Sequence, residues 1–308
     1  MQHVNIPNLS LQQIQIFVKA VELRNYTKVS EYFYFSPSMI SKTIARIEEM
    51  TGIELFVKES HILLPTPAAK IMAHELNSVL HTVEQCVERA HKTQNGEKSL
   101  ISIGFIDASD RFDRCLREIT GEFSALYPDV DLKIEKFDMH DLVEKLNEGL
   151  LDIILTSLHE RVALDAYHLS WELLIETNQA VYVSRACKLF ENDEIGFCDL
   201  RNEPFIILSP IDHVGYYTEF NSKCIASGFK PEIALMFTNI RSVLCNLQLG
   251  KGVFWGNAIT SDWVDDNIKK FDLPSKTGTI ISWGRHPNER AAQLVSFLRE
   301  QDYSLFYC

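Results

Sequence analysis

Residues 11–56 read LQQIQIFVKAVELRNYTKVSEYFYFSPSMISKTIARIEEMTGIELF, and their order of apolar residues, caps and breaks decides the fold class. Residues 11–23 predict a helix, because apolar side chains recur on one face at helical spacing. That face consists of Leu11, Ile14, Val18 and Val21. After a polar break, Thr27 is the expected N-cap of a short helix over residues 28–33.

The next helix has a clear start and a clear end. Ser36 is a good N-cap, Pro37 suits the first helical position, and Gly52 is expected to end the helix. Its apolar face consists of Ile40, Ile44 and Ile47. Two short helices behind a longer supporting helix form a helix-turn-helix pattern, whose second helix enters the major groove of DNA. The stretch therefore predicts a DNA-binding domain.

Beyond this stretch, residues 53–65 predict two short strands that form a wing. Thr66-Pro67 repeats the cap-and-proline start, and a long helix is expected to run to about Lys92. Its apolar residues follow a heptad spacing, at Ala69, Ala73, Leu76, Leu80, Val83, Val87 and Ala90. This seam predicts a dimerising coiled coil, and the alternative is a single helix packed on its own domain.

The polar segment 93–98 is the best linker, and from residue 100 strands alternate with helices. Such an order predicts a parallel sheet with helices on both faces, here in two lobes. We expect the chain to cross between the lobes near 157–166 and to return near 260–285. The expected domains are a winged helix-turn-helix (1–66), a linker and dimerisation helix (67–93), and a two-lobed effector domain (94–308, with lobe 1 at about 99–164 and 270–308 and lobe 2 at about 165–269).

Composition excludes several classes of protein. The formal net charge is −12, yet residues 1–92 carry nine basic and nine acidic residues, so the deficit lies behind them. No apolar run spans a bilayer and no signal peptide is evident, so we expect a cytoplasmic protein without a membrane partner. The seven cysteines have no zinc-ligand or CxxC spacing, and no catalytic or phosphate-binding motif occurs. We therefore expect no metal, no cofactor and no enzymatic activity.

The combined pattern resembles the LysR-type transcriptional regulators over essentially the whole chain, and most specifically in residues 9–72. The stretches LQQIQIFVKAVELRNYTKVSEYF, YFSPSMISKTIARIE and GIELF follow the family's N-terminal motifs. Pro37-Ser38 stands where the family usually has Gln-Pro, Lys58 replaces the usual Arg, and Ala69 replaces Gly. The resemblance implies a periplasmic-binding-protein-like effector domain, a homodimer or homotetramer on bent operator DNA, and RNA polymerase as a further candidate partner.

For double-stranded DNA, small hydroxyls and basic side chains on and around the recognition helix are the expected contacts. They are Thr27, Ser36, Pro37, Ser38, Ser41, Lys42, Arg46 and Lys58. For Ser36 the structural alternative is capping alone, and for Lys42 and Arg46 it is a solvated helix face.

For a small-molecule effector, polar residues just past the strand ends are the candidates, because ligands bind outside the carboxyl ends of strands in open α/β sheets. They are Asp107, Ser109, Asp138, His140, Ser157, Ser209, His213, Thr238, Asn239 and Asn257. Asp107 and Asp110 disfavour a simple anion and suit a ligand with an amine or hydroxyls. Many of these residues would serve equally well as caps and turn residues.

Two alternatives remain open at this point. A redox-sensing regulator of the same family would use a cysteine pair in the second lobe, where Cys224 has only Gly215 near the expected partner position. A solute-binding protein would share the two lobes, but the N-terminal helices and the missing export signal argue against it.

Overall fold

The computed structural model describes residues 9–59, 62–95, 98–106, 110–257, 264–285 and 287–303. The chain forms two compact units, Met1–Gln94 and Asn95–Cys308, and each is described by itself. No helix in the described ranges is long and apolar enough to cross a membrane.

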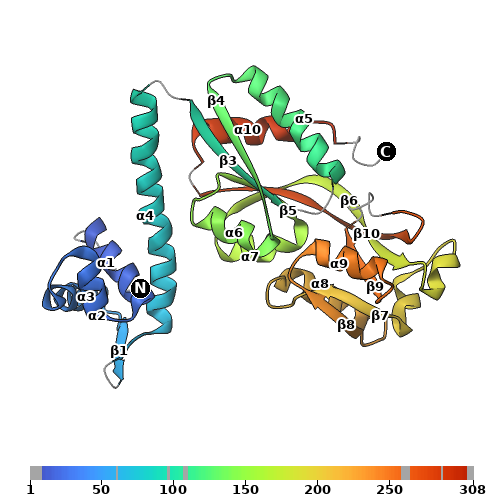
Figure 1. Ribbon diagram of the computed structural model, residues 1–308, viewed down its shortest axis with the longest axis horizontal. Coiled ribbons are helices and arrows are strands. Elements are labelled where there is room, and N and C mark those ends of the chain that lie inside the picture. The colour runs from blue at the N-terminus through green and yellow to red at the C-terminus, as the bar shows by residue number, and fades with distance from the viewer. Residues whose placement is uncertain are drawn as a thin grey trace. The chain divides into compact units, whose positions relative to one another are not determined.

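The N-terminal unit is a winged helix-turn-helix followed by a long helix (Figure 1). Its elements are α1 (Leu11–Leu23), α2 (Tyr26–Phe33), α3 (Pro37–Thr51), β1 (Phe56–Glu59), β2 (Ile62–Pro65) and α4 (Pro67–Gln94). The two strands pair antiparallel as the expected wing. The all-α winged fold class predicted for this part is confirmed.

The buried face of α1 differs from the expected one. Ile14 is buried as expected, but Leu11 is 45% exposed, and Ile16, Phe17 and Ala20 are buried in its place. The helix contacts α2, α3 and α4, so its sides face several partners. A single helical stripe could not represent this packing.

Helix α2 begins earlier than expected because Asn25, not Thr27, is its N-cap. The Asn25 Oδ1 accepts hydrogen bonds from the backbone N–H groups of Thr27 (2.9 Å) and Lys28 (3.2 Å). The prediction of Thr27 as the cap is wrong, since an Asn side chain satisfies the free N–H groups of a first helical turn equally well.

Replacing Asn25 by alanine should therefore lower the free energy of unfolding of the N-terminal unit by about 1 kcal/mol, the usual cost of losing a cap. The matched variant Thr27→Ala keeps the cap and should change stability by less than about 0.5 kcal/mol. Urea denaturation followed by circular dichroism measures both. Equal losses in the two variants would contradict the assignment of the cap.

Helix α3 has the expected caps at both ends. The Ser36 Oγ accepts from the Met39 N–H (3.2 Å), Pro37 occupies the first turn, and Gly52 has a left-handed φ of 69°. Ile40, Ile44 and Ile47 are buried in the core of the unit. These contacts fix the opposite face of α3 toward solvent.

The start of α4 belongs to the core of its own unit. Thr66 caps it by accepting from the Ala69 N–H (3.1 Å), and both Ala69 and Ala73 are buried with the helix-turn-helix residues. Farther along, Val79 and Val87 are 44% and 53% exposed. The first turns of α4 thus fit the alternative of a single helix packed on its own domain. The later turns leave apolar residues of the heptad seam exposed in the isolated chain.

The C-terminal unit contains an eight-stranded sheet in the order β4-β3-β5-β10-β6-β9-β7-β8. The strands are β3 (Ser99–Ile106), β4 (Val130–Phe137), β5 (Ile153–Ser157), β6 (Ser170–Ser184), β7 (Pro204–Leu208), β8 (Glu232–Phe237), β9 (Val253–Asn257) and β10 (Ile268–Trp283). Strands β3, β4 and β5 pair in parallel in lobe 1, and β7, β8 and β9 do so in lobe 2. The expected two-lobed α/β fold class is confirmed.

The two lobes are joined by the long strands β6 and β10, which pair antiparallel along their length. One end of β10 pairs with β5, and the far end of β6 pairs with β9 (Figure 1). The parallel pairing expected from the alternating strands and helices is present within each lobe, whereas the centre of the sheet is antiparallel. The segment near 157–166, expected to cross between lobes, is helical, and the chain crosses in β6.

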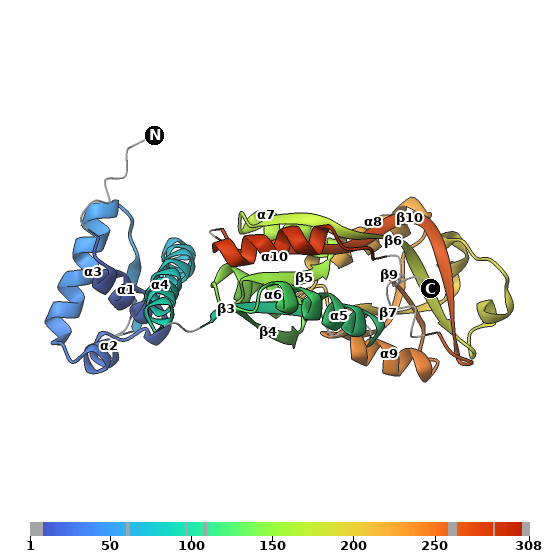
Figure 2. The same ribbon diagram turned by 90° about the horizontal axis from the view of Figure 1, so that it is seen from above.

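Helices flank both faces of the sheet in lobe 1. Along β5, Ile153 and Leu155 join the core under α5 and α10, whereas Ile154 joins the core under α6 and α7. This alternation buries the strand on both sides. The helices of the unit are α5 (Asp110–Leu126), α6 (Met139–Asn147), η1 (Leu158–Glu160), α7 (Arg161–Ala166), η2 (Lys188–Glu191), η3 (Phe197–Asn202), α8 (Val214–Ala226), α9 (Ile240–Gln248) and α10 (Glu289–Arg299). Figure 2 shows the same elements from above.

Candidate functional site

The solvent face of α3 carries most of the expected DNA contacts. Ser36, Ser38, Lys42 and Arg46 border one shallow surface hollow. Lys42 and Arg46 are exposed and form no ion pair with any residue that the structure describes. Two cations and several small polar groups on one exposed helix face can contact phosphates and base edges.

Three of the other expected DNA contacts do not border this hollow. Pro37 and Ser41 are on α3 but do not border it, and Thr27 is exposed in the first turn of α2. The side chain of Lys58 lies outside the described residues. Gln13 and Thr43 also border the hollow, and sequence reasoning missed both. Thr43 directly follows Lys42 in the sequence, and only the geometry of the helix shows that both side chains face the same hollow.

The C-terminal unit contains a cavity of about 60 Å³ at the carboxyl ends of its parallel strands. Lobe 1 contributes residues that end or follow β3, β4 and β5, and lobe 2 contributes residues that end or follow β7, β8 and β9. The lining consists of Ile106, Phe137, Asp138, Met139, Ser157, His159, Leu208, His213, Tyr216, Thr238, Asn239, Ile240, Phe254, Gly256 and Asn257. We call this space the inter-lobe cavity.

Six of the ten expected effector contacts line the inter-lobe cavity, namely Asp138, Ser157, His213, Thr238, Asn239 and Asn257. Ser209 does not line it. Its Oγ accepts from the Ile211 N–H (3.3 Å), and its carbonyl accepts from the His213 N–H (2.8 Å), so it shapes the turn before α8. Asp107, Ser109 and the side chain of His140 lie outside the described residues.

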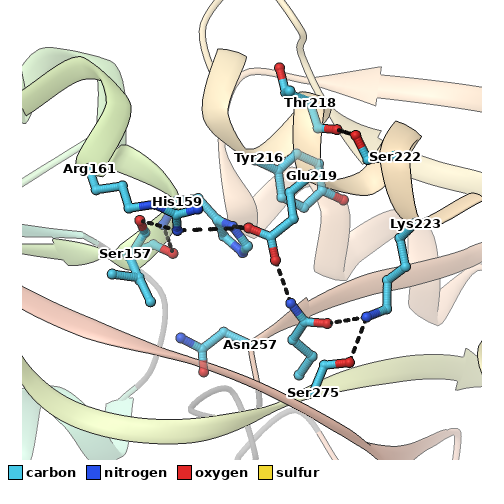
Figure 3. A network of polar contacts seen from close by, with 12 residues as sticks. Ser157, His159, Arg161, Tyr216, Thr218, Glu219, Ser222, Lys223, Asn257 and Ser275 are labelled. Atoms are coloured by element: carbon cyan, nitrogen blue, oxygen red, sulfur yellow. Dashed lines mark hydrogen bonds and ion pairs between the residues drawn. The ribbon is translucent and has the colours of Figure 1, made fainter. Parts of the chain in front are cut away.

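Sequence reasoning missed His159, which lines the cavity and is 5% exposed. Its Nδ1 lies 3.1 Å from the Glu219 Oε2, as Figure 3 shows. Its ring packs edge-on against Tyr216, with centroids 5.6 Å apart. Two residues separate His159 from the end of the predicted strand, and Glu219 lies inside a helix, so only folding brings the two together.

A chain of polar contacts continues from Glu219 (Figure 3). The Gln179 Nε2 donates to the Glu219 Oε1 (2.6 Å), and the Lys223 Nζ donates to the Gln179 Oε1 (2.7 Å) and to the Ser275 Oγ (2.7 Å). Burial alone would raise the pKa of Glu219, but His159, Arg161 and Gln179 outweigh it and hold that pKa below its ordinary value. Glu219 is therefore a carboxylate at neutral pH.

A second pair, Glu160 and His213, lies beside the first. Both side chains are buried, and the His213 Nδ1 is 3.9 Å from the Glu160 Oε1, which is an ion-pair distance too long for a hydrogen bond. The His213 Nε2 donates to the Thr238 carbonyl (2.7 Å). Burial would lower the pKa of His213, but the Glu160 carboxylate and the Thr238 carbonyl together raise it above its ordinary value.

These two pairs connect the lobes in opposite senses. His159 and Glu160 belong to η1, directly after β5 of lobe 1, whereas Glu219 lies in α8 and His213 is its N-cap in lobe 2. We call His159–Glu219 and Glu160–His213 the crossed pairs. They join η1 to α8 beside the inter-lobe cavity, and the two histidines, His159 and His213, also line that cavity.

Among the described residues, neither the cysteines nor the potential metal ligands form a second candidate site. Cys224 is fully buried, and burial raises the pKa of its thiol to about 11, which disfavours the reactive thiolate of a redox switch. The described cysteines, from Cys86 to Cys245, are all free thiols. Within the described ranges, no group of three or more His, Cys, Asp or Glu residues could hold a metal ion.

Comparisons with known proteins agree with this architecture. Residues 11–70 match the family model described as bacterial regulatory helix-turn-helix protein, lysR family. Residues 94–302 match the LysR substrate binding domain. The HTH-type transcriptional regulator AlsR of Bacillus subtilis (strain 168) is 25% identical over 249 residues, which cover 80% of this chain and 79% of that protein.

Solved structures show the same fold. The crystal structure of CbnR, a LysR family transcriptional regulator, superposes with a TM-score of 0.61 at 14% identity, covering 96% of this chain and all of that chain. Full-length CbnR complexed with its target DNA gives a TM-score of 0.60 at 15% identity, covering 94% of this chain and 99% of that chain. With a helix-turn-helix model at its front and a substrate-domain model over more than half of its length, this chain belongs to the LysR family of bacterial DNA-binding transcriptional regulators.

Proposed function

We propose that a small-molecule effector in the inter-lobe cavity controls how this regulator binds or activates its operator. The observation that carries this proposal is the lining of the cavity, which draws polar residues from the strand ends of both lobes. A ligand that contacts both lobes binds their closed arrangement more tightly than an open one, and this difference in affinity is what shifts a conformational equilibrium.

The exposed face of α3 is the proposed DNA contact, with Lys42 and Arg46 as its cations. The chain is proposed to act in the cytoplasm as a homodimer or homotetramer, with the exposed apolar residues of α4, including Val79 and Val87, in the subunit contact. RNA polymerase is a further proposed partner. A redox-sensing function would need a paired reactive thiol, and the buried Cys224 does not favour it.

A gel-shift titration with the DNA upstream of the protein's own gene tests the DNA contact. Lys42→Ala should weaken binding roughly tenfold and reduce the slope of log K against log salt by about 1, because one phosphate contact and its released counterion are lost. The matched variant Lys251→Ala removes an exposed cation from the C-terminal unit and should change neither value. An unchanged slope in Lys42→Ala would remove α3 from the DNA contact.

A further inference from the structure

The buried imidazole of His159 has one ring nitrogen without a hydrogen-bond partner among the described residues. Its Nδ1 faces Glu219, but its Nε2 is buried and has no hydrogen-bond partner among the described residues. Leaving a buried polar atom without a partner costs free energy, so such an atom in a native cavity calls for a missing partner. Since His159 lines the inter-lobe cavity, a ligand there can supply that partner.

The helix N-termini around the cavity favour a negative charge. The N-caps of α6 and α8, Asp138 and His213, both line the cavity, and neither side chain caps its own helix. The first N–H groups of a helix lack intrahelical acceptors and carry a partial positive charge. A carboxylate or similar anion is the group that such helix ends bind.

The rest of the lining favours a ligand with one charge, because both ring nitrogens of the other lining histidine, His213, face protein groups. Among the lining residues that the structure describes there is no Lys or Arg, and much of the lining is apolar, including Phe137, Leu208 and Phe254. A second anionic group would lie in this apolar part without a partner. Asp138 is acidic but exposed, and Asp110, which was expected to repel anions, is paired with Arg241 at 2.8 Å.

We propose that the effector is a compact monocarboxylic acid whose carboxylate accepts a hydrogen bond from a protonated His159 Nε2. This inference rests on the proposed function and names the ligand class for that cavity. The acid arrives as its anion, a proton from solvent binds the Nε2, and the resulting N–H donates to a carboxylate oxygen. A cavity of about 60 Å³ holds about five water-sized groups, which suits acids of two to four carbons.

The groups around His159 support an imidazolium in the complex. From α8, Glu219 faces its Nδ1 and Tyr216 packs on its ring, while Arg161 of α7 lies 4.0 Å from Glu219. Trp255 of β9 packs on the ring and has no titrating group. Lys223 donates its hydrogen bonds to Gln179 and Ser275 rather than to Glu219. The carboxylate of Glu219 is thus the charge in direct contact with His159, and it stabilises the added proton.

The test uses the full chain, with acetate, propionate and butyrate as probes and ethanol, propan-1-ol and butan-1-ol as uncharged counterparts. At least one acid should raise the melting temperature, whereas its alcohol should not, because only an anion uses the helix ends and the imidazolium. Calorimetry in phosphate and Tris buffers counts protons. If the Nε2 gains its proton on binding, the binding heat should differ between the two buffers, because that proton is drawn from the buffer.

His159→Gln keeps an amide near the cavity but cannot take up the proton, so acid affinity should fall at least tenfold and proton uptake should vanish. The matched variant is His168→Asn, an exposed histidine outside the cavity whose left-handed φ of 54° suits asparagine. It should leave both quantities unchanged. If His159→Gln fails to fold, the comparison of acids with alcohols and the proton count on the wild-type chain still decide.

The ligand class is overturned if no acid stabilises the chain, if alcohols match the acids, or if binding takes up no proton. Gel shifts on the operator separate this result from the proposed function. Operator binding that responds to a non-acidic metabolite overturns the carboxylic acid and leaves the regulator standing. Acid binding with proton uptake, but with no effect on operator binding or transcription, supports the ligand class and overturns the proposed control.

Discussion

Gly215→Ala should lower the free energy of unfolding of the C-terminal unit by about 3 kcal/mol, at the upper end of the usual cost of overpacking. Gly215 is the second residue of α8, and a Cβ placed there would lie 2.0 Å from the backbone carbonyl oxygen of His159. A backbone atom cannot turn away as a flexible side chain can, so α8 or η1 must move. Equilibrium unfolding in urea measures the loss.

The same movement should disturb the crossed pairs, because η1 carries His159 and Glu160. Effector-induced stabilisation should therefore fall together with stability. Gly121→Ala is the matched control, since Gly121 lies within α5 and a Cβ there meets no atom within 4 Å. Removing glycine from a helix interior should stabilise the unit by up to about 1 kcal/mol. If the two variants had equal stability, the close approach of α8 to η1 would be refuted.

The features that the sequence predicted well depend on neighbouring residues. The cap at Ser36, the proline at 37 and the break at Gly52 act within one turn of chain, so the bounds of α3 follow from them. Polar residues past the strand ends are also local signals, and six of those selected line one cavity. Asn25 and Thr27 are both good N-cap residues by type, and only the observed hydrogen bond to the Asn25 side chain shows which of them caps α2.

The missed features depend on contacts between distant residues. Strand β10 begins at Ile268 and pairs with β6 along its length. Its first part was not predicted, because polar residues such as Lys269 and Lys270 interrupt the apolar pattern of a strand. His159 and Glu219 are sixty positions apart, and neither has a distinctive neighbourhood in the sequence. Long-range antiparallel pairing and buried polar partners follow from the fold as a whole, which periodicity does not report.

Glu160→Gln should destabilise the C-terminal unit by about 3 kcal/mol at pH 6, because removing one partner of a buried pair leaves the other uncompensated. The pKa of His213 is raised in the folded state, against the pull of burial, chiefly through Glu160. A histidine whose pKa is raised by folding stabilises the folded state fully at pH values below its ordinary pKa of 6.5. This stabilisation is lost as the pH rises through the pKa of the folded state. The cost of Glu160→Gln should thus shrink between pH 6 and pH 8.5.

The direction of this pH dependence separates an ion pair from simple packing. Were Glu160 only filling space, Gln would fill it equally well and any difference in unfolding free energy would be the same at both pH values. Glu194→Gln, at an exposed glutamate, provides the baseline and should differ from wild type by less than about 0.5 kcal/mol at either pH. Because Glu160 and His213 sit on opposite lobes, a pH-dependent cost also means that protonation of His213 strengthens a contact between the two lobes.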